Sequence, residues 1–224
     1  MSAQQVLILA ASRGIGHELA CQYVARGARV TATARTPADI EALKQMGAQA
    51  FDLDVTDPTR VGALSWRLEG SSFDTVFLCA GLMGPRHAGL DAPDRQDFDA
   101  VMHTNVLSAM WILPQLTEVL GPQARVGVLS SQMGSIGSRQ TAQCWLYRAS
   151  KAALNSVVKD AALTWAGRMI CVALHPGWVR TDMGGPKADL SPQQSARDLI
   201  STLERLGVQD SGGFFNHDAK PIPW

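Results

Sequence analysis

The strongest structural signal in the chain is residues 6–16, which read Val-Leu-Ile-Leu-Ala-Ala-Ser-Arg-Gly-Ile-Gly. The apolar run from Val6 to Ala10 predicts a buried strand, and Leu19, Ala20, Tyr23 and Val24 then repeat with helical spacing. A strand, a glycine turn and a helix start present free backbone N–H groups and a positive dipole end to a pyrophosphate. The alternative is an ordinary glycine turn. We predict that the turn binds nucleotide phosphates through Ser12, Arg13, Gly14, Ile15 and Gly16.

Short apolar runs alternate with longer segments of helical spacing along the rest of the chain, as in an α/β protein. The predicted strands are Val6 to Ala10, Arg29 to Ala34, Ala48 to Leu53, Thr75 to Cys79, Arg125 to Ser130, Met169 to His175 and Gly213 to Phe215. Nearly all of their residues are apolar, which is typical of strands covered on both faces. We therefore predict a single-domain Rossmann fold: a doubly wound parallel sheet with helices on both faces.

Three helix starts are predicted at Thr36-Pro37, Asp57-Pro58 and Ser191-Pro192, where a capping side chain precedes a proline. The segments Asn105 to Leu120 and Leu154 to Trp165 are apolar over more than one stripe. Helices buried on a second side favour an oligomer interface, so we expect a homodimer or homotetramer. The last residues, from Asn216 to Trp224, lack helical spacing and are expected to pack on the domain or on a neighbouring subunit.

The composition and the charge of the chain exclude several classes of function. The 224 residues are 46% hydrophobic and 18% charged, and 20 Lys and Arg balance 20 Asp and Glu, as expected for one domain over residues 1–224. No basic run indicates nucleic-acid binding, and no apolar run reaches the length of a membrane span or signal segment. We therefore expect a cytoplasmic protein. The four cysteines form no CxxC pair and the histidines lack metal-ligand spacing, so no metal site is predicted.

The end of the second predicted strand indicates which dinucleotide binds. An NAD site places a carboxylate there, against the ribose 2′-hydroxyl. This chain has Ala34-Arg35 instead, and Asp39 is better explained as an acid in the first turn of a helix. Arg35 and Arg13 would offer forked donors to a 2′-phosphate. We predict NADP, or NADPH, as cofactor; the alternative is that Arg35 is a solvated loop charge.

Tyr147 and Lys151 are four residues apart, which places them on one face of a helix. A free phenol has a pKa near 10 and becomes useful near neutral pH only where its phenolate is stabilised, for example by an ammonium group. The pair alone occurs often by chance. Ser131, at the end of a central strand, strengthens the interpretation because its hydroxyl can reach the same substrate oxygen.

The chain resembles the short-chain dehydrogenase/reductase family over nearly its whole length. The resemblance rests on motifs in order: Ser12-Arg13-Gly14-Ile15-Gly16, Asn105, Ser130-Ser131 before Tyr147-x-x-x-Lys151, and Pro176-Gly177-Trp178-Val179 with Thr181. The stretches around Tyr147, Thr181 and Gly212 to Asn216 look more narrowly like C-factor and sniffer-type carbonyl reductases.

The resemblance implies roles for these residues. Tyr147 donates the proton to a carbonyl oxygen, Lys151 lowers the pKa of Tyr147 and holds the nicotinamide ribose, Ser131 orients the carbonyl, and Asn105 holds a water. The implied cofactor contacts are Asp54 and Val55 at the adenine, Ala80 and Gly81 at the adenosine ribose, and Pro176, Val179 and Thr181 around the carboxamide and pyrophosphate.

Two departures from the family pattern concern the cofactor site. Leu9-Ala10 stands where the family usually has Thr-Gly, and Leu78-Cys79 stands where it usually has Asn-Asn. Alanine is disfavoured in a left-handed backbone. We expect the turn at Ala10 to have moved to a conformation that alanine tolerates; the alternative is that its methyl group crowds the phosphate.

The leading functional hypothesis is NADPH-dependent reduction of a small, largely apolar ketone or aldehyde. The alternative is an NADP-binding signalling protein of C-factor type with little turnover. The complete set of Asn105, Ser131, Tyr147 and Lys151 favours chemistry. A sugar-nucleotide epimerase would need a larger substrate lobe than the residues after Thr181 can build.

Overall fold

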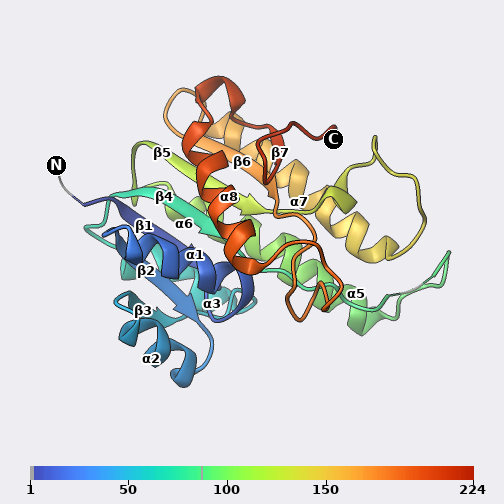
Figure 1. The fold of residues 1–224 in the computed structure, drawn as a ribbon, viewed down its shortest axis with the longest axis horizontal. Helices are drawn as coiled ribbons and strands as arrows, with labels where there is room; N and C mark the ends of the chain where they lie inside the picture. The colour runs from blue at the N-terminus through green and yellow to red at the C-terminus, as the bar shows by residue number, and fades with distance from the viewer. Residues whose placement is uncertain (1–2, 87) are drawn as a thin grey trace.

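The computed structural model describes residues 3–86 and 88–224 and centres on one parallel sheet (Figure 1). Its strands are β1 (Gln5–Leu9), β2 (Arg29–Ala34), β3 (Gln49–Asp52), β4 (Phe73–Leu78), β5 (Leu120–Leu129), β6 (Ile170–His175) and β7 (Phe214–Asn216). They lie in the order β3-β2-β1-β4-β5-β6-β7. The chain runs outward in one direction from β1 to β3 and in the other from β4 to β7, so the switch point of the sheet lies between β1 and β4.

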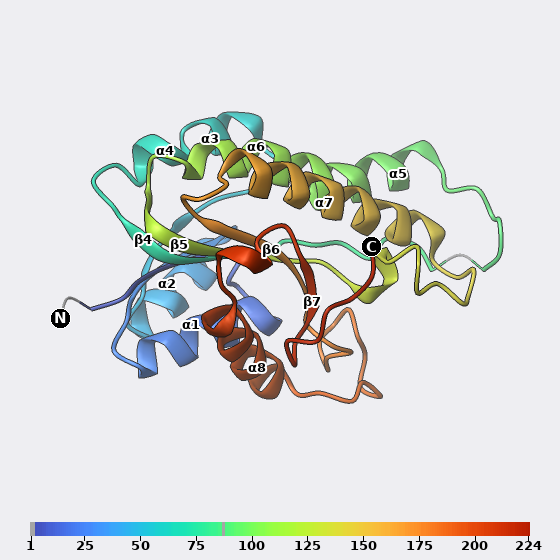
Figure 2. The same ribbon diagram turned by 90° about the horizontal axis from the view of Figure 1, so that it is seen from above.

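Helices cover both faces of the sheet, as Figure 2 shows, with α3, α4, α6 and α7 on one face and α1, α2 and α8 on the other. Their bounds are α1 Gly14–Ala25, α2 Pro37–Gln45, α3 Pro58–Gly62, α4 Leu64–Arg67, α5 Arg95–Met102, α6 Ser108–Leu116, α7 Trp145–Thr164 and α8 Pro192–Arg205. A π-helical turn (His103–Leu107) joins α5 to α6, and short 3-10 turns span Gln132–Gly134 and Val208–Asp210. The predicted doubly wound fold is confirmed.

The predicted helix starts are also confirmed, each by a side chain that accepts a hydrogen bond from the first turn. Thr36 caps α2, Asp57 caps α3 and Ser191 caps α8. Each cap satisfies a backbone N–H that has no partner inside the helix. The central strands β1, β4 and β6 are almost completely buried, and two apolar clusters, one on each face of the sheet, form the core.

Two predicted boundaries are wrong. The helix expected from Asn105 to Leu120 contains the π-helical turn and ends at Leu116. The strand expected from Arg125 begins at Leu120, with a register shift against β4. Gly121 and Pro122 explain the difference, because this pair ends a helical pattern. The apolar residues before it therefore divide between the end of the helix and the start of the strand.

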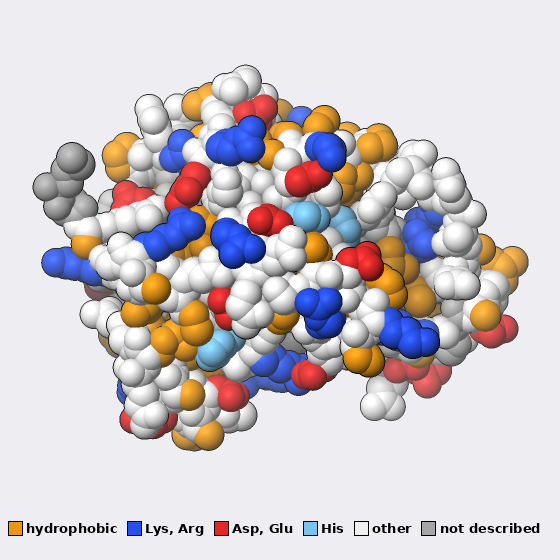
Figure 3. Space-filling model, in the orientation of Figure 1, with side chains coloured by type: hydrophobic (Ala, Val, Ile, Leu, Met, Phe, Trp, Pro, Cys, Tyr) orange, Lys and Arg blue, Asp and Glu red, His pale blue; other side chains and the backbone are white. Residues whose placement is uncertain are grey.

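Charged side chains of both signs are interspersed over the face drawn in Figure 3, with no continuous basic patch there. Among the helices of the described residues, none combines the length and the apolar character that crossing a membrane requires. The residues after β7 turn back along that strand, with Ile222 N donating to the carbonyl of Phe214 at 2.7 Å. Of the two expectations for this segment, packing on its own domain is confirmed.

Candidate functional site

A cavity of about 540 Å³ opens at the carboxyl ends of the strands around the switch point. This is the edge where ligands bind in doubly wound sheets. Most of the predicted site residues line it: Ser12, Arg13, Gly14, Ile15, Gly16, Arg35, Asp54, Val55, Ala80, Gly81, Tyr147, Lys151, Pro176 and Thr181. Three do not: Asn105, Ser131 and Val179. The fold thus brings residues from at least five loops to one cavity.

The turn after β1 leaves the start of α1 open to this cavity. Thr36, Asp57, Asp94 and Ser191 cap other helices through their side chains, but Arg13 makes no such bond at the start of α1. Gly16 has no room for a side chain, because a Cβ there would lie 2.4 Å from the carbonyl oxygen of Ala10. The uncapped N–H groups and the helix dipole are suited to an anion such as a pyrophosphate.

The expectation that the turn has adapted at Ala10 is wrong. Ala10 has φ 65°, in the left-handed region. Hydrogen bonds explain why the backbone stays there: Ala10 N donates to Thr33 Oγ1 at 3.0 Å, and Ala11 N donates to the Thr33 carbonyl at 2.7 Å. Thr33 is buried in β2. The turn therefore keeps the shape that suits glycine, at a cost in strain for alanine.

Replacing Ala10 with glycine should stabilise the protein by about 1 kcal/mol, because relief of left-handed strain exceeds the entropy that glycine adds to the unfolded chain. Ala219→Gly is a matched control, since Ala219 has φ 66° outside the cavity. Urea denaturation should show similar gains for both variants. A gain for Ala219→Gly with none for Ala10→Gly would contradict strain at the phosphate turn.

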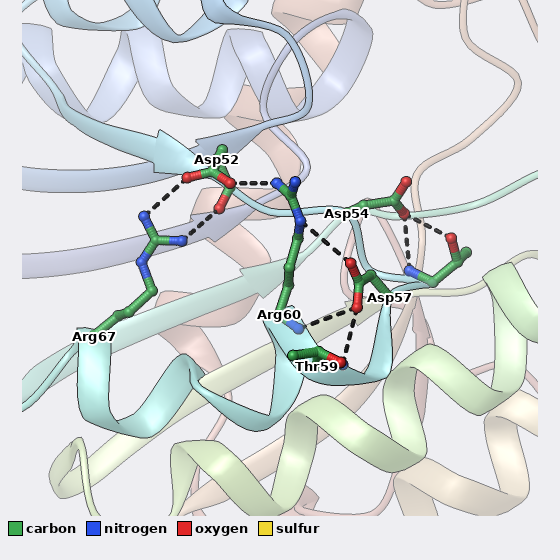
Figure 4. Close-up of polar contacts among 7 residues, drawn as sticks. Asp52, Asp54, Asp57, Thr59, Arg60 and Arg67 are labelled. Atoms are coloured by element: carbon green, nitrogen blue, oxygen red, sulfur yellow. Dashed lines mark hydrogen bonds and ion pairs between the residues drawn. The ribbon is translucent and has the colours of Figure 1, made fainter.

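One end of the cavity contains Arg35, a cation that forms no close ion pair among the described residues. Arg60 and Arg67 both bind Asp52, and Arg60 also binds Asp57 (Figure 4). Arg35, after β2, forms no ion pair or side-chain hydrogen bond within the described residues. Its guanidinium is therefore available to an anionic group in the cavity.

Asp54 lies beside Arg35 at the same end. Partial burial raises the pKa of Asp54, but hydrogen bonds from Thr56 and the positive charge of Arg35 lower it, and the net shift is downward. Thr56 donates through its amide at 2.9 Å and its hydroxyl at 2.7 Å (Figure 4). Asp54 is thus ionised at neutral pH and held in one orientation by its own loop.

Arg13, in the turn after β1, lines the same cavity as Arg35. Its Nη1 lies 3.0 Å from Asp182 Oδ2, and the two side chains are 74% and 79% exposed. Exposed pairs contribute little to stability. Arg13 can therefore exchange Asp182 for another anion at small cost.

Tyr147 and Lys151 lie on one face of α7, and both are buried. Lys151 Nζ lies 5.8 Å from the centre of the Tyr147 ring and donates to the carbonyl of Leu129 at 2.8 Å. Burial raises the pKa of Tyr147 to about 12, while a hydrogen bond with Ser131 acts in the opposite direction. We expected the pKa of Tyr147 to be lowered, but it is raised, because the burial of the phenol outweighs the stabilisation of its phenolate. The phenol is therefore protonated at neutral pH.

Burial also lowers the pKa of Lys151 to about 8. Desolvation destabilises the charged ammonium. Its hydrogen-bond partner is the neutral carbonyl of Leu129, which does not compensate the charge as a carboxylate would. Lys151 thus titrates much closer to neutral pH than an exposed lysine. A phenol that holds its proton and an ammonium that releases one readily lie side by side in this wall of the cavity.

Asn105 lies in the π-helical turn and joins the loop after β4 to α7. Its Oδ1 accepts from Leu82 N at 2.7 Å, and its Nδ2 donates to the Leu82 carbonyl at 2.8 Å and to Ser150 Oγ at 2.9 Å. Both amide hydrogens are used, whereas Oδ1 accepts only one of the two bonds that it can, which leaves one position for the water that the resemblance implies. In the structure Asn105 positions the loop after β4 against the helix that carries Tyr147.

Val179 and Thr181 follow β6 and differ in their placement. Thr181 lines the cavity, close enough to Gly14 that a Cβ there would lie 3.3 Å from Thr181 Cγ2. Val179 is buried, and its carbonyl accepts from Thr181 N at 2.8 Å. Val179 therefore supports the loop from behind.

Sequence reasoning missed part of the lining: Ala34, Leu53, Thr56, Leu82, Thr104, Leu129, Ser130, Arg180, Asp182 and Pro192. Several of these residues end a strand or follow one directly. Their position at the strand ends could have indicated them, whereas their residue types could not. Ser130 is the most polar of the buried ones, and its hydroxyl donates to Asn155 Oδ1 at 2.5 Å. No cluster of three or more potential metal ligands occurs among residues 3–86 and 88–224.

Comparison with known proteins finds a matching family model and similar proteins. A family model described as enoyl-(acyl carrier protein) reductase matches residues 9–211. C-signal of Myxococcus xanthus is 39% identical over 120 residues, which cover 53% of this chain and 70% of that protein.

Two solved structures cover 100% of both chains. Carbonyl reductase Sniffer of D. melanogaster has a TM-score of 0.89 at 27% identity, and the NADPH-bound carbonyl reductase from chicken fatty liver has a TM-score of 0.89 at 29% identity. The parallel sheet, the uncapped turn after β1 and the pairing of Tyr147 with Lys151 agree with these matches. The chain belongs to the short-chain dehydrogenase/reductase family.

Proposed function

We propose that residues 1–224 form one NADP-binding domain that reduces a small carbonyl compound, a ketone or an aldehyde, with Tyr147 as proton donor. The observation that carries the proposal is the placement of Tyr147 and Lys151 in the wall of the cavity that also contains the phosphate turn. One ligand lying along this cavity would reach from Arg35 to Tyr147. The NADPH-bound carbonyl reductase of the same fold supports this arrangement.

The residues that line the cavity fit NADP. The uncapped amides of residues 12–16 would hold the pyrophosphate, and Arg13 with Arg35 would hold the 2′-phosphate. The proposed contacts to the other groups are Asp54 and Val55 at the adenine, Ala80 and Gly81 at the adenosine ribose, Lys151 at the nicotinamide ribose, and Pro176 and Thr181 around the carboxamide, with Val179 supporting their loop from behind. When bound, the reduced nicotinamide supplies a hydride to the carbonyl carbon.

The chain supplies the proton. Ser131 would hydrogen-bond the carbonyl oxygen of the substrate and hold it near Tyr147. The phenol, which is protonated at neutral pH, then donates its proton to that oxygen, and the product is an alcohol. Lys151 stabilises the phenolate that remains, because its ammonium lies beside the Tyr147 ring.

Arg35→Ala tests the cofactor assignment. Removing the guanidinium should weaken NADPH binding by about 10- to 100-fold, because charge-assisted bonds to a phosphate contribute about 1.5–3 kcal/mol. NADH binding should stay within about twofold, since NADH lacks the 2′-phosphate. Fluorescence titration of both cofactors measures the change, and Arg139→Ala, an exposed arginine outside the cavity, is the control. Equal losses for NADPH and NADH would refute the assignment.

The second candidate is an NADP-binding signalling protein with little turnover, which the similarity to C-signal favours. Turnover separates the two. Purified protein mixed with NADPH and a panel of small ketones and aldehydes should consume NADPH in proportion to enzyme concentration. Tight NADPH binding with no consumption on any carbonyl would favour the signalling role instead.

A further inference from the structure

The residues after β7, 217–224, form a returning segment that runs back along that strand. Ala219 N donates to the Asn216 carbonyl at 2.9 Å, Asn216 N to the Lys220 carbonyl at 2.8 Å, and Ile222 N to the Phe214 carbonyl at 2.7 Å. These bonds define a turn followed by a short antiparallel stretch. The segment ends beside the loop between β5 and α7, as Figure 2 shows.

The returning segment bonds directly to this loop. Gly137 N donates to the Trp224 carbonyl at 2.8 Å. The hydroxyl of Ser135, which is completely buried, donates to the carbonyl of Pro223 and accepts from Ser138 N at 3.1 Å. Backbone groups at the end of the returning segment thus satisfy a buried hydroxyl and an amide of this loop, just after its 3-10 turn at Gln132–Gly134.

Trp224 anchors the end of the segment. Its ring stacks on the ring of Phe214, with centroids 5.7 Å apart and planes 22° apart. Phe214 is buried in β7, whereas Trp224 is 43% exposed. The Trp224 ring is therefore held by this stacking contact, while its carbonyl accepts from Gly137 N and from the Ser135 hydroxyl.

The braced loop begins at the catalytic wall. The hydroxyl of Ser131 accepts from Met133 N at 3.1 Å, and the Ser131 carbonyl accepts from Gly134 N at 2.8 Å. Gly134 packs on the backbone of Lys151, where a Cβ at Gly134 would lie 2.8 Å from the Lys151 carbonyl carbon. A shift of Ser135 would therefore be transmitted through a tight turn to Ser131 and Lys151.

We propose that the returning segment, anchored by Trp224, is a brace that holds Ser131 in position beside Tyr147. Trp224 lines no part of the cavity, so it is a positioning residue and does not touch the reacting groups. The effect of the brace on catalysis rests on the proposed carbonyl reduction, whereas its effect on the rigidity of the loop does not.

Trp224→Ala tests the brace. We expect kcat for carbonyl reduction to fall about fivefold with KM and the NADPH dissociation constant within about twofold, because the variant disturbs alignment and not binding. Trp224→Phe, which keeps an aromatic ring on Phe214, should restore kcat to within about twofold. Trp66→Ala is the matched control, since Trp66 is 75% exposed and lies in α4, away from the segment.

Hydrogen exchange gives a readout that needs no turnover. The amides of Gly137 and Ser138 should exchange about tenfold faster in Trp224→Ala than in the unaltered protein, and at the unaltered rate in Trp66→Ala. Unchanged exchange at both amides, or an equal fall of kcat in Trp66→Ala, would overturn the brace. If the unaltered protein reduces no carbonyl, the proposed function fails, and the exchange rates alone decide whether the brace exists.

Discussion

Tyr147→Phe should abolish carbonyl reduction while NADPH binds nearly as before. The substitution removes only the phenolic oxygen, and general acid catalysis contributes about 10²–10⁴-fold to a reaction rate. The loss should appear in kcat, because in the proposed reaction Tyr147 transfers its proton only in the transition state. Single-turnover measurements with NADPH and an aldehyde provide the test, with fluorescence titration to confirm that the cofactor still binds.

The chain contains its own matched control. Its only other tyrosine, Tyr23, is fully buried between α1 and the sheet, and its hydroxyl has no hydrogen-bond partner within the described residues. Tyr23→Phe should therefore leave turnover unchanged and leave stability equal or slightly higher. A Tyr147→Phe protein with the turnover of Tyr23→Phe on any carbonyl substrate would end the enzyme interpretation.

Lys151→Ala should damage both activity and cofactor binding. The ammonium lies where it can stabilise the Tyr147 phenolate and hold the nicotinamide ribose, so its removal affects chemistry and binding together. We expect kcat to fall about 10²-fold or more and NADPH binding to weaken about tenfold. Lys159→Ala, an exposed lysine two turns further along α7, is the control. A loss of activity with no loss of NADPH affinity would contradict the ribose contact.

The same variant should change how stability depends on pH. Burial lowers the pKa of Lys151 from 10.5 to about 8, so between these values the unfolded chain binds the proton more tightly than the folded protein does. Folding is therefore penalised below about pH 8, and the penalty disappears as the pH rises toward 10.5. The difference in unfolding free energy between the two proteins should change over this range by about 3 kcal/mol. Urea denaturation at a series of pH values measures it; parallel curves would contradict a buried ammonium.

Much of the fold could be predicted because parallel strands and capped helices leave local signals. The buried run from Arg29 to Ala34 matches β2, and the caps at Thr36, Asp57 and Ser191 start helices as expected. The boundary near Leu120 could not be predicted, because apolar residues on the two sides of Gly121 suit a helix and a strand equally well.

The candidate site shows a similar division. Residue chemistry pointed to the phosphate turn, to Arg35 and to the pairing of Tyr147 with Lys151, and the cavity contains all of them. The Leu129 carbonyl that accepts from Lys151 is a backbone group, which no residue type reveals. The left-handed φ of Ala10 depends on hydrogen bonds to Thr33, more than twenty residues away. Such properties arise from tertiary contacts and not from local sequence.

The returning segment also determines which surfaces can associate. β7 lies at one edge of the sheet, and an edge strand with free N–H and C=O groups is a template for pairing with another chain. Here Pro221 bridges to Phe215 and Ile222 bonds to Phe214, so the outer side of β7 is already occupied. Pro221 and Pro223 have no N–H to offer to a further strand. The segment therefore protects this edge against strand addition and aggregation, and of the two edges of the sheet only the one at β3 is left without such a cover from residues 217–224.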